Sequence, residues 1–492
     1  MPPLTKLFIN GEYRPSSSEP PTFEVLNPFS HQVVGLCSTA SSRDCHDAIE
    51  AANKAFASWE NTTPWQRRDV LLKAADHIST EKYKRALITG QREETAATDG
   101  WGYGQWVVAQ NFLRTTASMA NELKGESFVS GSVAGAQVVT QRRALGVILA
   151  IAPWNAALTL TLRTIAVPIL CGNTIVFKCS ELSPRSQAIV ADLFAEAGLP
   201  PGVLNIMSIS RETAPELTAE IIAHLMVRKV AFTGSERVGR ILAMEAAKFL
   251  KPCVLELGGK APVVVLSDAN IREAARSIVF GAMAHSGQVC MSAERVIVHQ
   301  DVAEQLVGEV KRLCEGIKAG DPSNSSDPSV KLGALFSEAS ARNVVSMMQE
   351  AVDGGARLVL GDLKHEGSVV QPHLLADVDV GMRLWKEESF GPVTVFMSVN
   401  TIDDAVEMAN ATTYSLSTAL WTTDVHSAVA VAPCIRAGVT SVNGPTFHSE
   451  AYVGVIGLGG SSGYGRFDVE NFTDKRSIIS HPDWERPYPG LL

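Results

Sequence analysis

The chain has 492 residues and a formal net charge of −9, with 46% hydrophobic, 19% charged and 7% aromatic residues. This length exceeds what one ordinary hydrophobic core supports and predicts about two or three domains that fold without disulfide or metal staples. The composition excludes disordered and collagen-like classes. The acidic balance, with its scattered Lys and Arg, argues against nucleic acid as a partner.

The eight cysteines form no Cys-x-x-Cys pair and no dense framework, which is typical of a reducing compartment. The first residues lack the basic and apolar regions of a signal peptide, so we expect a cytoplasmic protein. We expect no bound metal, because no cluster of metal ligands is visible. His285 lies near Cys290, but an unpartnered histidine is more often a core or surface residue than a ligand.

Residues 131–143 begin with turn-forming glycines and continue into the β-favouring Val138, Val139 and Thr140, which predicts an exposed hairpin. Exposed strands invite pairing with another chain. The next segment, residues 144–162, is uncharged and close to the ~20 residues of a membrane-spanning helix. Pro153 interrupts it midway, so we interpret it as a buried strand, a loop and a helix, with no membrane partner.

After residue 145, short apolar runs alternate with helical stretches, which is typical of β-α units around a parallel sheet. Strands are predicted over residues 145–151 and 174–178. Ligands of such sheets bind beyond the carboxyl ends of the strands, where Asn155 and Lys178 stand.

A third unit, residues 230–239, is predicted as a strand, a tight turn at Gly234 and a helix with Ser235 as N-cap. The free N–H groups at such a helix start favour a phosphate. The apolar residues of this helix keep near-helical spacing as far as Leu250. The strand over residues 252–257 then ends at two glycines, which place Glu256 at a seam before a second α/β region.

Cys290 follows Gly287, Gln288 and Val289 in a small loop that exposes the sulfur and supplies backbone N–H groups beside it. A thiol reacts as its thiolate, so the loop marks a candidate nucleophile. Glu256 is the candidate base, either for this thiol or for a water molecule.

Two further observations are weaker evidence for a cofactor site. The dinucleotide-binding motif Gly-x-Gly-x-x-Gly does not occur between a predicted strand and a helix. Lys178 and Glu181 lie at the end of a predicted strand, where they fit either the hydroxyls of a ribose or a solvated surface pair.

Six motifs share one order and spacing with a known family. They are Pro153-Trp154-Asn155, Lys178-Cys179-Ser180-Glu181, Phe232-Thr233-Gly234-Ser235, Glu256-Leu257-Gly258-Gly259-Lys260, Gly287-Gln288-Val289-Cys290 and Glu387-Glu388-Ser389-Phe390-Gly391-Pro392. Together they resemble the aldehyde dehydrogenase superfamily over nearly the whole chain.

The resemblance implies an α/β fold with three parts. Residues 1–122 and 144–257 would form a Rossmann-type cofactor-binding domain, and residues 258–455 an α/β catalytic domain. Residues 123–143 and 456–492 would form a small β oligomerisation element, which implies a homodimer or homotetramer.

The resemblance also implies NAD-dependent oxidation of an aldehyde to its carboxylic acid. Cys290 would attack the carbonyl to give a thiohemiacetal, whose oxyanion the Asn155 amide and the Cys290 N–H would stabilise. After hydride transfer to the nicotinamide, Glu256 would activate the water that hydrolyses the thioester.

The cofactor residues carry over from the same motifs. They are Lys178 and Glu181 at the adenosine ribose, Gly234 and Ser235 at the pyrophosphate, and Glu388 with Phe390 at the nicotinamide ribose. Trp154 is a further predicted cofactor-binding residue. A carboxylate at position 181 accepts bonds from both ribose hydroxyls and repels a 2′-phosphate, which favours NAD over NADP. A neighbouring Arg or Lys could offset that repulsion.

The predicted substrate pocket contains Ala156, Arg163, Val289 and Met291, and these surroundings look most like salicylaldehyde-type dehydrogenases. That resemblance implies an aromatic aldehyde. Arg163 lies eight residues after Asn155, about 2.2 helical turns, so its side chain would face the ligand and pair with a ring hydroxyl or carboxylate. The alternative for Arg163 is a salt bridge elsewhere.

The chain departs from the family at its C-terminal end. The stretch from Ile456 to Arg466 lacks the Pro-Phe and Lys common there, and Phe467 replaces a Glu found in many members. Glu256 must then act without a second carboxylate. Alternatives are an aliphatic or semialdehyde dehydrogenase, an acylating enzyme that passes the acyl group to coenzyme A, and a non-enzymatic scaffold. Glu256 argues against the acylating enzyme, and the intact set of Cys290, Glu256 and Asn155 argues against the scaffold.

Overall fold

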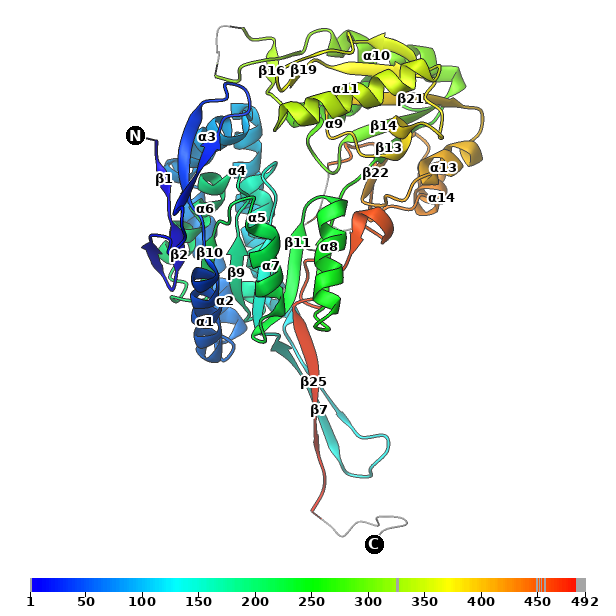
Figure 1. The fold of residues 1–492 in the computed structure, drawn as a ribbon. Helices are drawn as coiled ribbons and strands as arrows, with labels where there is room; N and C mark the ends of the chain where they lie inside the picture. Colours follow the sequence, from blue (N-terminus) through cyan, green and yellow to red (C-terminus); the bar gives the residue numbers. More distant parts are fainter. Residues whose placement is uncertain are drawn as a thin grey trace.

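The computed structural model describes residues 2–323, 327–447, 450, 452, 454 and 457–483. Two α/β lobes lie beside each other, and a narrow β arm projects from the first lobe (Figure 1). Ile456 and residues 484–492, which belong to the predicted C-terminal part of the oligomerisation element, lie outside the described residues.

The first lobe is built on an eight-stranded sheet in the order β24-β12-β11-β8-β9-β10-β2-β3. Its strands are β2 (Leu7–Ile9), β3 (Glu12–Arg14), β8 (Val147–Ile151), β9 (Thr174–Lys178), β10 (Leu204–Met207), β11 (Val227–Thr233), β12 (Cys253–Glu256) and β24 (Gly463–Tyr464). The strands from β12 to β10 are parallel, and β24 and the β2–β3 hairpin join antiparallel. Every residue of β8, β9 and β10 is buried, because both faces of these central strands are covered, and most of their side chains are apolar.

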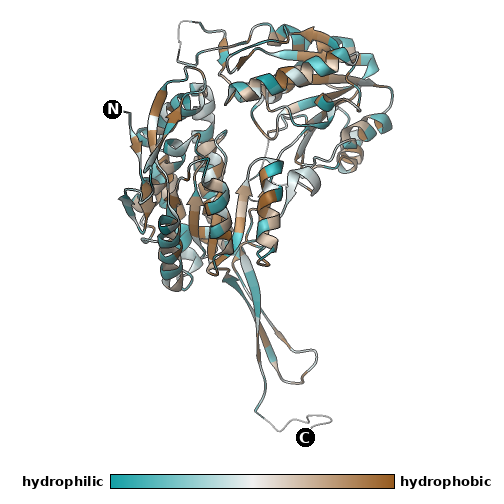
Figure 2. Ribbon diagram, in the orientation of Figure 1, coloured by the Kyte–Doolittle hydropathy of each residue, from teal (hydrophilic) through white to brown (hydrophobic). Residues whose placement is uncertain are grey.

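Helices cover both faces of this sheet, and the most hydrophobic colours of Figure 2 follow the central strands between them. The helices are α1 (Ser42–Trp59), α2 (Pro64–Ile78), α3 (Glu81–Thr95), α4 (Asp99–Ser118), α5 (Ala157–Leu170), α6 (Pro184–Glu196), α7 (Ala214–Ala223) and α8 (Glu236–Ala247). One apolar core joins α2 to α6 to the sheet, and a second core joins α1, α7 and α8. The helices α5 to α8 each connect two parallel strands, so the strands end at one common edge.

The second lobe is built on a seven-stranded sheet in the order β17-β20-β21-β14-β13-β22-β23. Its strands are β13 (Ala261–Val265), β14 (Ala293–His299), β17 (Arg357–Leu360), β20 (His373–Ala376), β21 (Val393–Val399), β22 (Ser417–Trp421) and β23 (Val439–Val442). Its helices are α9 (Ile271–Met283), α10 (Gln300–Cys314), α11 (Glu338–Asp353), α12 (Arg383–Lys386), α13 (Ile402–Asn410) and α14 (Val425–Val431). Only the β17–β20 pairing in this sheet, among the described residues, is antiparallel.

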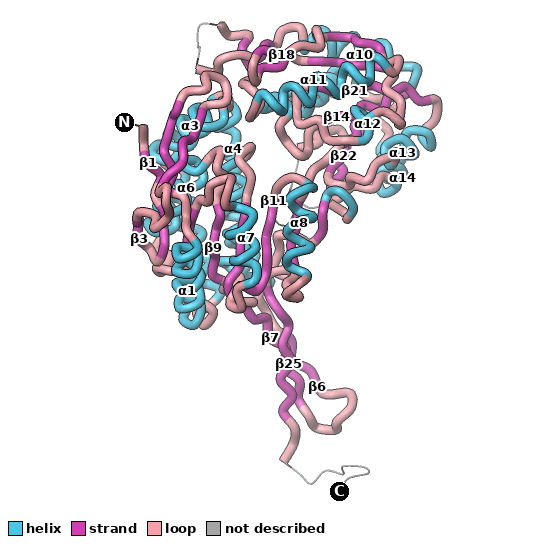
Figure 3. Tube along the Cα trace, in the orientation of Figure 1, coloured by secondary structure: helices cyan, strands magenta, loops and turns pink. Residues whose placement is uncertain are grey.

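The arm is a three-stranded antiparallel sheet in the order β25-β7-β6, visible as paired strands in Figure 3. Its strands are β6 (Glu126–Val129), β7 (Gln137–Ala144) and β25 (Thr473–Ser480). The predicted hairpin is therefore present, but it begins at Glu126, before the glycines, and a third strand from the C-terminal end completes it. Phe128, Val129 and Ile479 are each more than half exposed on this arm.

Small elements complete the fold. They are β1 (Leu4–Thr5), β4 (Thr22–Leu26), β5 (Val33–Ser38), β15 (Lys318–Ala319), β16 (Val330–Leu332), β18 (His365–Glu366), β19 (Val369–Val370), and the 3-10 turns η1 (Met119–Glu122), η2 (Ala284–Gly287), η3 (Ala432–Cys434) and η5 (Gly460–Ser462). The β1-β5-β4 sheet lies at the N-terminal side of the first lobe.

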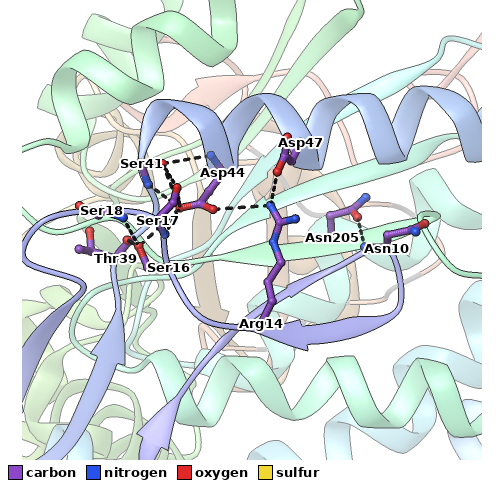
Figure 4. Close-up of polar contacts among 10 residues, drawn as sticks. All are labelled: Asn10, Arg14, Ser16, Ser17, Ser18, Thr39, Ser41, Asp44, Asp47 and Asn205. Atoms are coloured by element: carbon purple, nitrogen blue, oxygen red, sulfur yellow. Dashed lines mark hydrogen bonds and ion pairs between the residues drawn. The ribbon is translucent and has the colours of Figure 1, made fainter.

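Polar contacts tie the N-terminal segment to the start of α1 (Figure 4). Ser41 caps α1, since its side chain accepts the N–H of Asp44 and the Asp44 carboxylate accepts the Ser41 N–H at 3.0 Å. The same carboxylate accepts the Ser17 N–H at 3.1 Å. Arg14 lies 2.8 Å from Asp47 and 3.6 Å from Asp44, so one acidic helix start fixes two parts of the preceding chain.

The uncharged segment forms β8, a loop and the start of α5, as predicted from its Pro153 interruption. No helix within the described ranges is long and apolar enough to cross a membrane. The helix after Ser235 is shorter than predicted, because α8 ends at Ala247 and Leu250 is 93% exposed in a left-handed conformation. The apolar spacing in the sequence therefore predicted a longer buried helix face than the structure has.

Candidate active site

Cys290 lies in a sharply turned loop between α9 and β14. Three successive residues before it, His285, Ser286 and Gly287, have positive φ values of 51°, 59° and 73°. A side chain at Gly287 would bring its Cβ to 1.9 Å from the carbonyl oxygen of Gly391, so only glycine fits there. Left-handed non-glycine residues are uncommon and often mark functional loops.

The Cys290 thiol points at the carboxylate of Glu256. Its Sγ donates to Oε1 of Glu256 at 3.4 Å. Glu256 is the last residue of β12 and is fully buried. The loop passes so close to the end of β12 that a Cβ on Gly259 would lie 2.0 Å from the Cys290 carbonyl oxygen. The two groups predicted as nucleophile and base are thus brought together from the two lobes.

Burial raises the pKa of the Cys290 thiol to about 11. The Arg163 guanidinium and the backbone N–H groups of Cys290 and Met291 act in the opposite direction, while Glu388 adds to the rise. A thiol with this pKa is protonated near neutral pH, so its activation requires a proton acceptor at hydrogen-bond range. Glu256 occupies that position.

We expect the alkylation rate of Cys290 by iodoacetamide, without cofactor, to rise about tenfold per pH unit from about pH 7 to 10 with no plateau. The thiolate fraction grows in this way below a pKa near 11. Mass spectrometry of a Cys434→Ser variant checks the rate, because Cys434 is exposed, whereas the six cysteines other than Cys290 and Cys434 are buried. A plateau below pH 9 would contradict the raised pKa.

Asn155 follows β8 and reaches the Cys290 loop. Its Nδ2 donates to the Gln288 carbonyl oxygen at 2.8 Å, which leaves the second hydrogen of this amide group for another acceptor. Its backbone oxygen accepts a bond from Trp101 Nε1 at 2.8 Å. The Oδ1 atom is buried and has no hydrogen-bond partner among the described residues.

The buried Gln288 side chain stabilises the Cys290 loop through hydrogen bonds. Its side-chain oxygen accepts the Phe336 N–H at 2.8 Å, and its side-chain nitrogen donates to the His285 carbonyl at 3.1 Å. The His285 ring stacks on Trp101 with 5.1 Å between centroids. Burial lowers the pKa of His285 to about 3, so this ring is neutral and packs as a core side chain, one of the two placements predicted for it.

Arg163 forms an ion pair with Glu256 Oε2 across the end of the first sheet. The same guanidinium lies 3.3 Å from Thr233 Oγ1, and Thr233 donates to Glu256 Oε2 at 3.2 Å. Thr233 and Glu256 are register partners on β11 and β12, which explains their contact. The Arg163 guanidinium also lies over the Phe467 ring, 5.2 Å from its centroid.

The residues predicted at the adenosine ribose and pyrophosphate stand at the carboxyl ends of β9 and β11. Lys178 ends β9 and is buried, with its Nζ donating to the Cys179 carbonyl at 3.1 Å, and Glu181 is half-buried. Ser235 caps α8, with its hydroxyl accepting the Val238 N–H at 3.5 Å. A Cβ on Gly234 would lie 2.4 Å from the Phe232 ring, so this turn has no side chain at position 234. Its backbone N–H groups fit a phosphate.

Glu388 and Phe390 lie across from them in the second lobe. The Glu388 carboxylate accepts the Gly259 N–H at 2.9 Å. Burial, with the charge of Glu294, raises the pKa of Glu388 to about 8. Phe390, in a left-handed conformation, meets Trp154 edge-on with 6.1 Å between ring centroids.

Sequence reasoning missed a buried network behind Glu388. Glu294 pairs with Lys260 at 2.5 Å and accepts bonds from both the N–H and the hydroxyl of Ser389, at 3.0 and 2.6 Å. Glu294 lies four residues after Cys290. The signal available in the sequence was the pair of charged residues Glu294 and Arg295 directly before the apolar run Val296-Ile297-Val298.

Two of the predicted substrate-pocket residues, Val289 and Met291, flank Cys290 in the loop itself. Val289 packs in a small apolar cluster with Met291, Leu416, Val439 and Phe447. Ala156 precedes α5 without capping it. In the part of the chain that the structure describes, no group of three or more His, Cys, Asp or Glu residues could hold a metal ion.

This fold and site define an aldehyde dehydrogenase: residues 13–479 match the aldehyde dehydrogenase family, and the chain belongs to it. It is thus an NAD(P)-dependent oxidoreductase of aldehydes, which confirms the fold class and the activity expected from the six motifs.

Its relatives include enzymes of aromatic aldehydes. The chain is 40% identical to a vanillin dehydrogenase of Pseudomonas fluorescens over 488 residues, which cover 98% of this chain and 99% of that protein. It is 37% identical to a salicylaldehyde dehydrogenase of Pseudomonas sp. (strain C18), with 99% of each chain covered. The crystal structure of a salicylaldehyde dehydrogenase from Pseudomonas putida G7, complexed with salicylaldehyde, superposes with a TM-score of 0.94 at 36% identity over 99% of this chain and 100% of that one.

Proposed function

We propose that this enzyme oxidises aromatic aldehydes to carboxylic acids with NAD, using Cys290 as nucleophile. The contact of Cys290 Sγ with Glu256 Oε1 at 3.4 Å carries this proposal, because it joins a thiol to a carboxylate that can take its proton. The similarity to vanillin and salicylaldehyde dehydrogenases supports the aromatic class.

In the first half-reaction, Glu256 takes the proton of Cys290 and the thiolate attacks the aldehyde carbonyl. The second N–H of the Asn155 amide and the backbone N–H of Cys290 hold the oxyanion of the thiohemiacetal, and each such donor contributes about 3 kcal/mol. A nicotinamide cofactor, when bound, supplies the hydride acceptor that converts the thiohemiacetal into a thioester.

Glu256 releases the proton of Cys290 to solvent before the second half-reaction, in which it takes a proton from a water molecule that attacks the thioester carbonyl. The carbon–sulfur bond breaks, the carboxylic acid leaves and Cys290 is regenerated. The family resemblance implies a carboxylate at the position of Phe467 in many members, and without that group Glu256 carries this step alone.

The residues present fit a nicotinamide dinucleotide. The start of α8 offers N–H groups to the pyrophosphate, and Glu181 and Glu388 offer carboxylates to the two riboses. Glu181 favours NAD, because a carboxylate at that ribose repels a 2′-phosphate. We further propose a cytoplasmic homodimer or homotetramer, supported by the free cysteines and by the exposed apolar residues of the arm.

We expect NADH formation with benzaldehyde, salicylaldehyde and vanillin at a kcat/KM at least about tenfold above that with hexanal or succinate semialdehyde. Absorbance at the NADH band checks this, with NADP run in parallel and expected to be the poorer cofactor. Turnover should need no coenzyme A. Preference for the semialdehyde would replace the aromatic class with the alternative, and no turnover of any aldehyde by folded enzyme would indicate a scaffold.

A further inference from the structure

Both oxygens of the Glu256 carboxylate, the proposed base, already have partners in this structure. One oxygen of the Glu256 carboxylate accepts the Cys290 thiol, and the other is shared by Arg163 and Thr233. A carboxylate whose charge a guanidinium already compensates is a weak proton acceptor, because protonation would cost it that ion pair. Glu256 can still take the proton of the Cys290 thiol in this state, because the Arg163 charge also favours the thiolate. A water molecule is a much weaker acid than a thiol, so hydrolysis of the thioester requires Arg163 to release the Glu256 carboxylate.

Burial makes this ion pair persistent. Glu256 is fully buried and the Arg163 side chain is only 12% exposed, so water does not screen the two charges. Separating a buried pair without replacing either partner is strongly unfavourable. Some other group must therefore receive the guanidinium when Glu256 is released.

The Arg163 guanidinium has an unused hydrogen-bond donor for such a group. Its Nε is buried and has no hydrogen-bond partner in the described part of the protein. Its guanidinium rests on the Phe467 ring, which supports the cation but accepts no strong hydrogen bond. Phe467 thus leaves Arg163 available, where a carboxylate at that position would bind it.

The acyl group on Cys290 comes within reach of this cation. The sulfur and the guanidinium contact opposite oxygens of the same carboxylate, so they are separated by a single carboxyl group. Arg163 is also the cation whose charge acts on the Cys290 sulfur. An oxygen on the ring of a bound aromatic acyl group can therefore meet the guanidinium.

We propose that Arg163 is a positioning residue that gates the hydrolytic base, and that a ring hydroxyl of the substrate opens the gate by accepting the Arg163 N–H groups. This inference rests on the proposed function and names its substrate class as hydroxylated benzaldehydes. Glu256, freed from the guanidinium, accepts the proton of the attacking water. Substrates without the hydroxyl leave the base paired and form a slowly hydrolysed thioester.

The test isolates thioester hydrolysis from oxidation. The full-length enzyme without cofactor is acylated with 4-nitrophenyl esters of benzoic acid and of 2-, 3- and 4-hydroxybenzoic acid. The Cys290 thiolate displaces 4-nitrophenolate, and mass spectrometry follows the loss of the acyl group at about pH 8. We expect at least one hydroxybenzoyl group to leave about tenfold or more faster than benzoyl.

Arg163→Met gives the decisive comparison. We expect the hydroxyl advantage to disappear and benzoyl hydrolysis to become several-fold faster than in the parent, because the base is no longer paired. Arg163→Lys, which keeps the charge but fewer donors, should retain part of the advantage. Arg276→Met on α9, where Arg276 is exposed and pairs with Glu273, is the matched control and should behave as the parent.

Equal hydrolysis of all four acyl groups by the parent would overturn the gate, as would an Arg163→Met variant that slows every group alike. The aldehyde panel separates this failure from failure of the proposed function. NADH formation from aromatic aldehydes together with equal hydrolysis rates refutes only the gate, whereas absence of NADH formation refutes the dehydrogenase.

Discussion

Cys290→Ala should lower kcat/KM for aromatic aldehydes by at least about 10⁴-fold, because no other group can form the covalent intermediate. The thiol is the group that the tight loop directs at Glu256, 3.4 Å away. Replacing it by a methyl group removes the nucleophile and leaves the ion pair of Glu256 with Arg163 in place. NADH formation over a panel of aldehydes measures the loss.

The control is Cys434→Ser, at an exposed thiol on the second lobe, which should retain parental turnover. Binding of NAD to Cys290→Ala, followed by protein fluorescence, should stay close to the parental value. Parental turnover by Cys290→Ala would place the nucleophile elsewhere in the chain.

Glu256→Gln should lower steady-state kcat by about 10²- to 10⁴-fold, because the amide accepts no proton from the hydrolytic water. The substitution also weakens the route by which the thiol loses its proton, since the contact of 3.4 Å is then made to an amide. Mass spectrometry should find the acyl group on Cys290 after mixing with aldehyde and NAD. Hydroxylamine, which attacks thioesters without a general base, should restore turnover.

The same variant should lose stability. Removing the carboxylate leaves the Arg163 cation buried without its partner, which costs about 3–5 kcal/mol. The double variant Glu256→Gln/Arg163→Met removes both charges and should recover most of the melting temperature but not the hydrolysis. A stable double variant with parental kcat would assign the base to another residue.

Elements and caps near the candidate site were predictable where the signal lies in a short stretch of sequence. Apolar runs that end in polar residues placed β9 at 174–178, and a serine before an amphipathic stretch placed the cap of α8. Six ordered motifs predicted the family, which the match over residues 13–479 confirms. The catalytic and cofactor roles assigned to single residues remain predictions.

The sequence was less informative where the burial of a residue had to be inferred from the spacing of apolar residues alone. The helix after Ser235 ends at Ala247, because periodicity shows which residues share a face but not whether another element covers it. The arm begins at Glu126 and gains β25 from residues more than 300 positions away, a pairing that depends on where the two segments meet in space.

The sequence by itself determined the family, several strands of the first sheet, and the candidate nucleophile and base, because these depend on residue type, local pattern and motif order. The tertiary structure alone decided what those residues meet. Arg163 on α5 reaches Glu256 at the end of β12, and Phe467 lies beneath the guanidinium, because the parallel sheet brings distant segments to one edge. Charges so far apart in the chain leave no local signal, since only burial in a common core makes them partners.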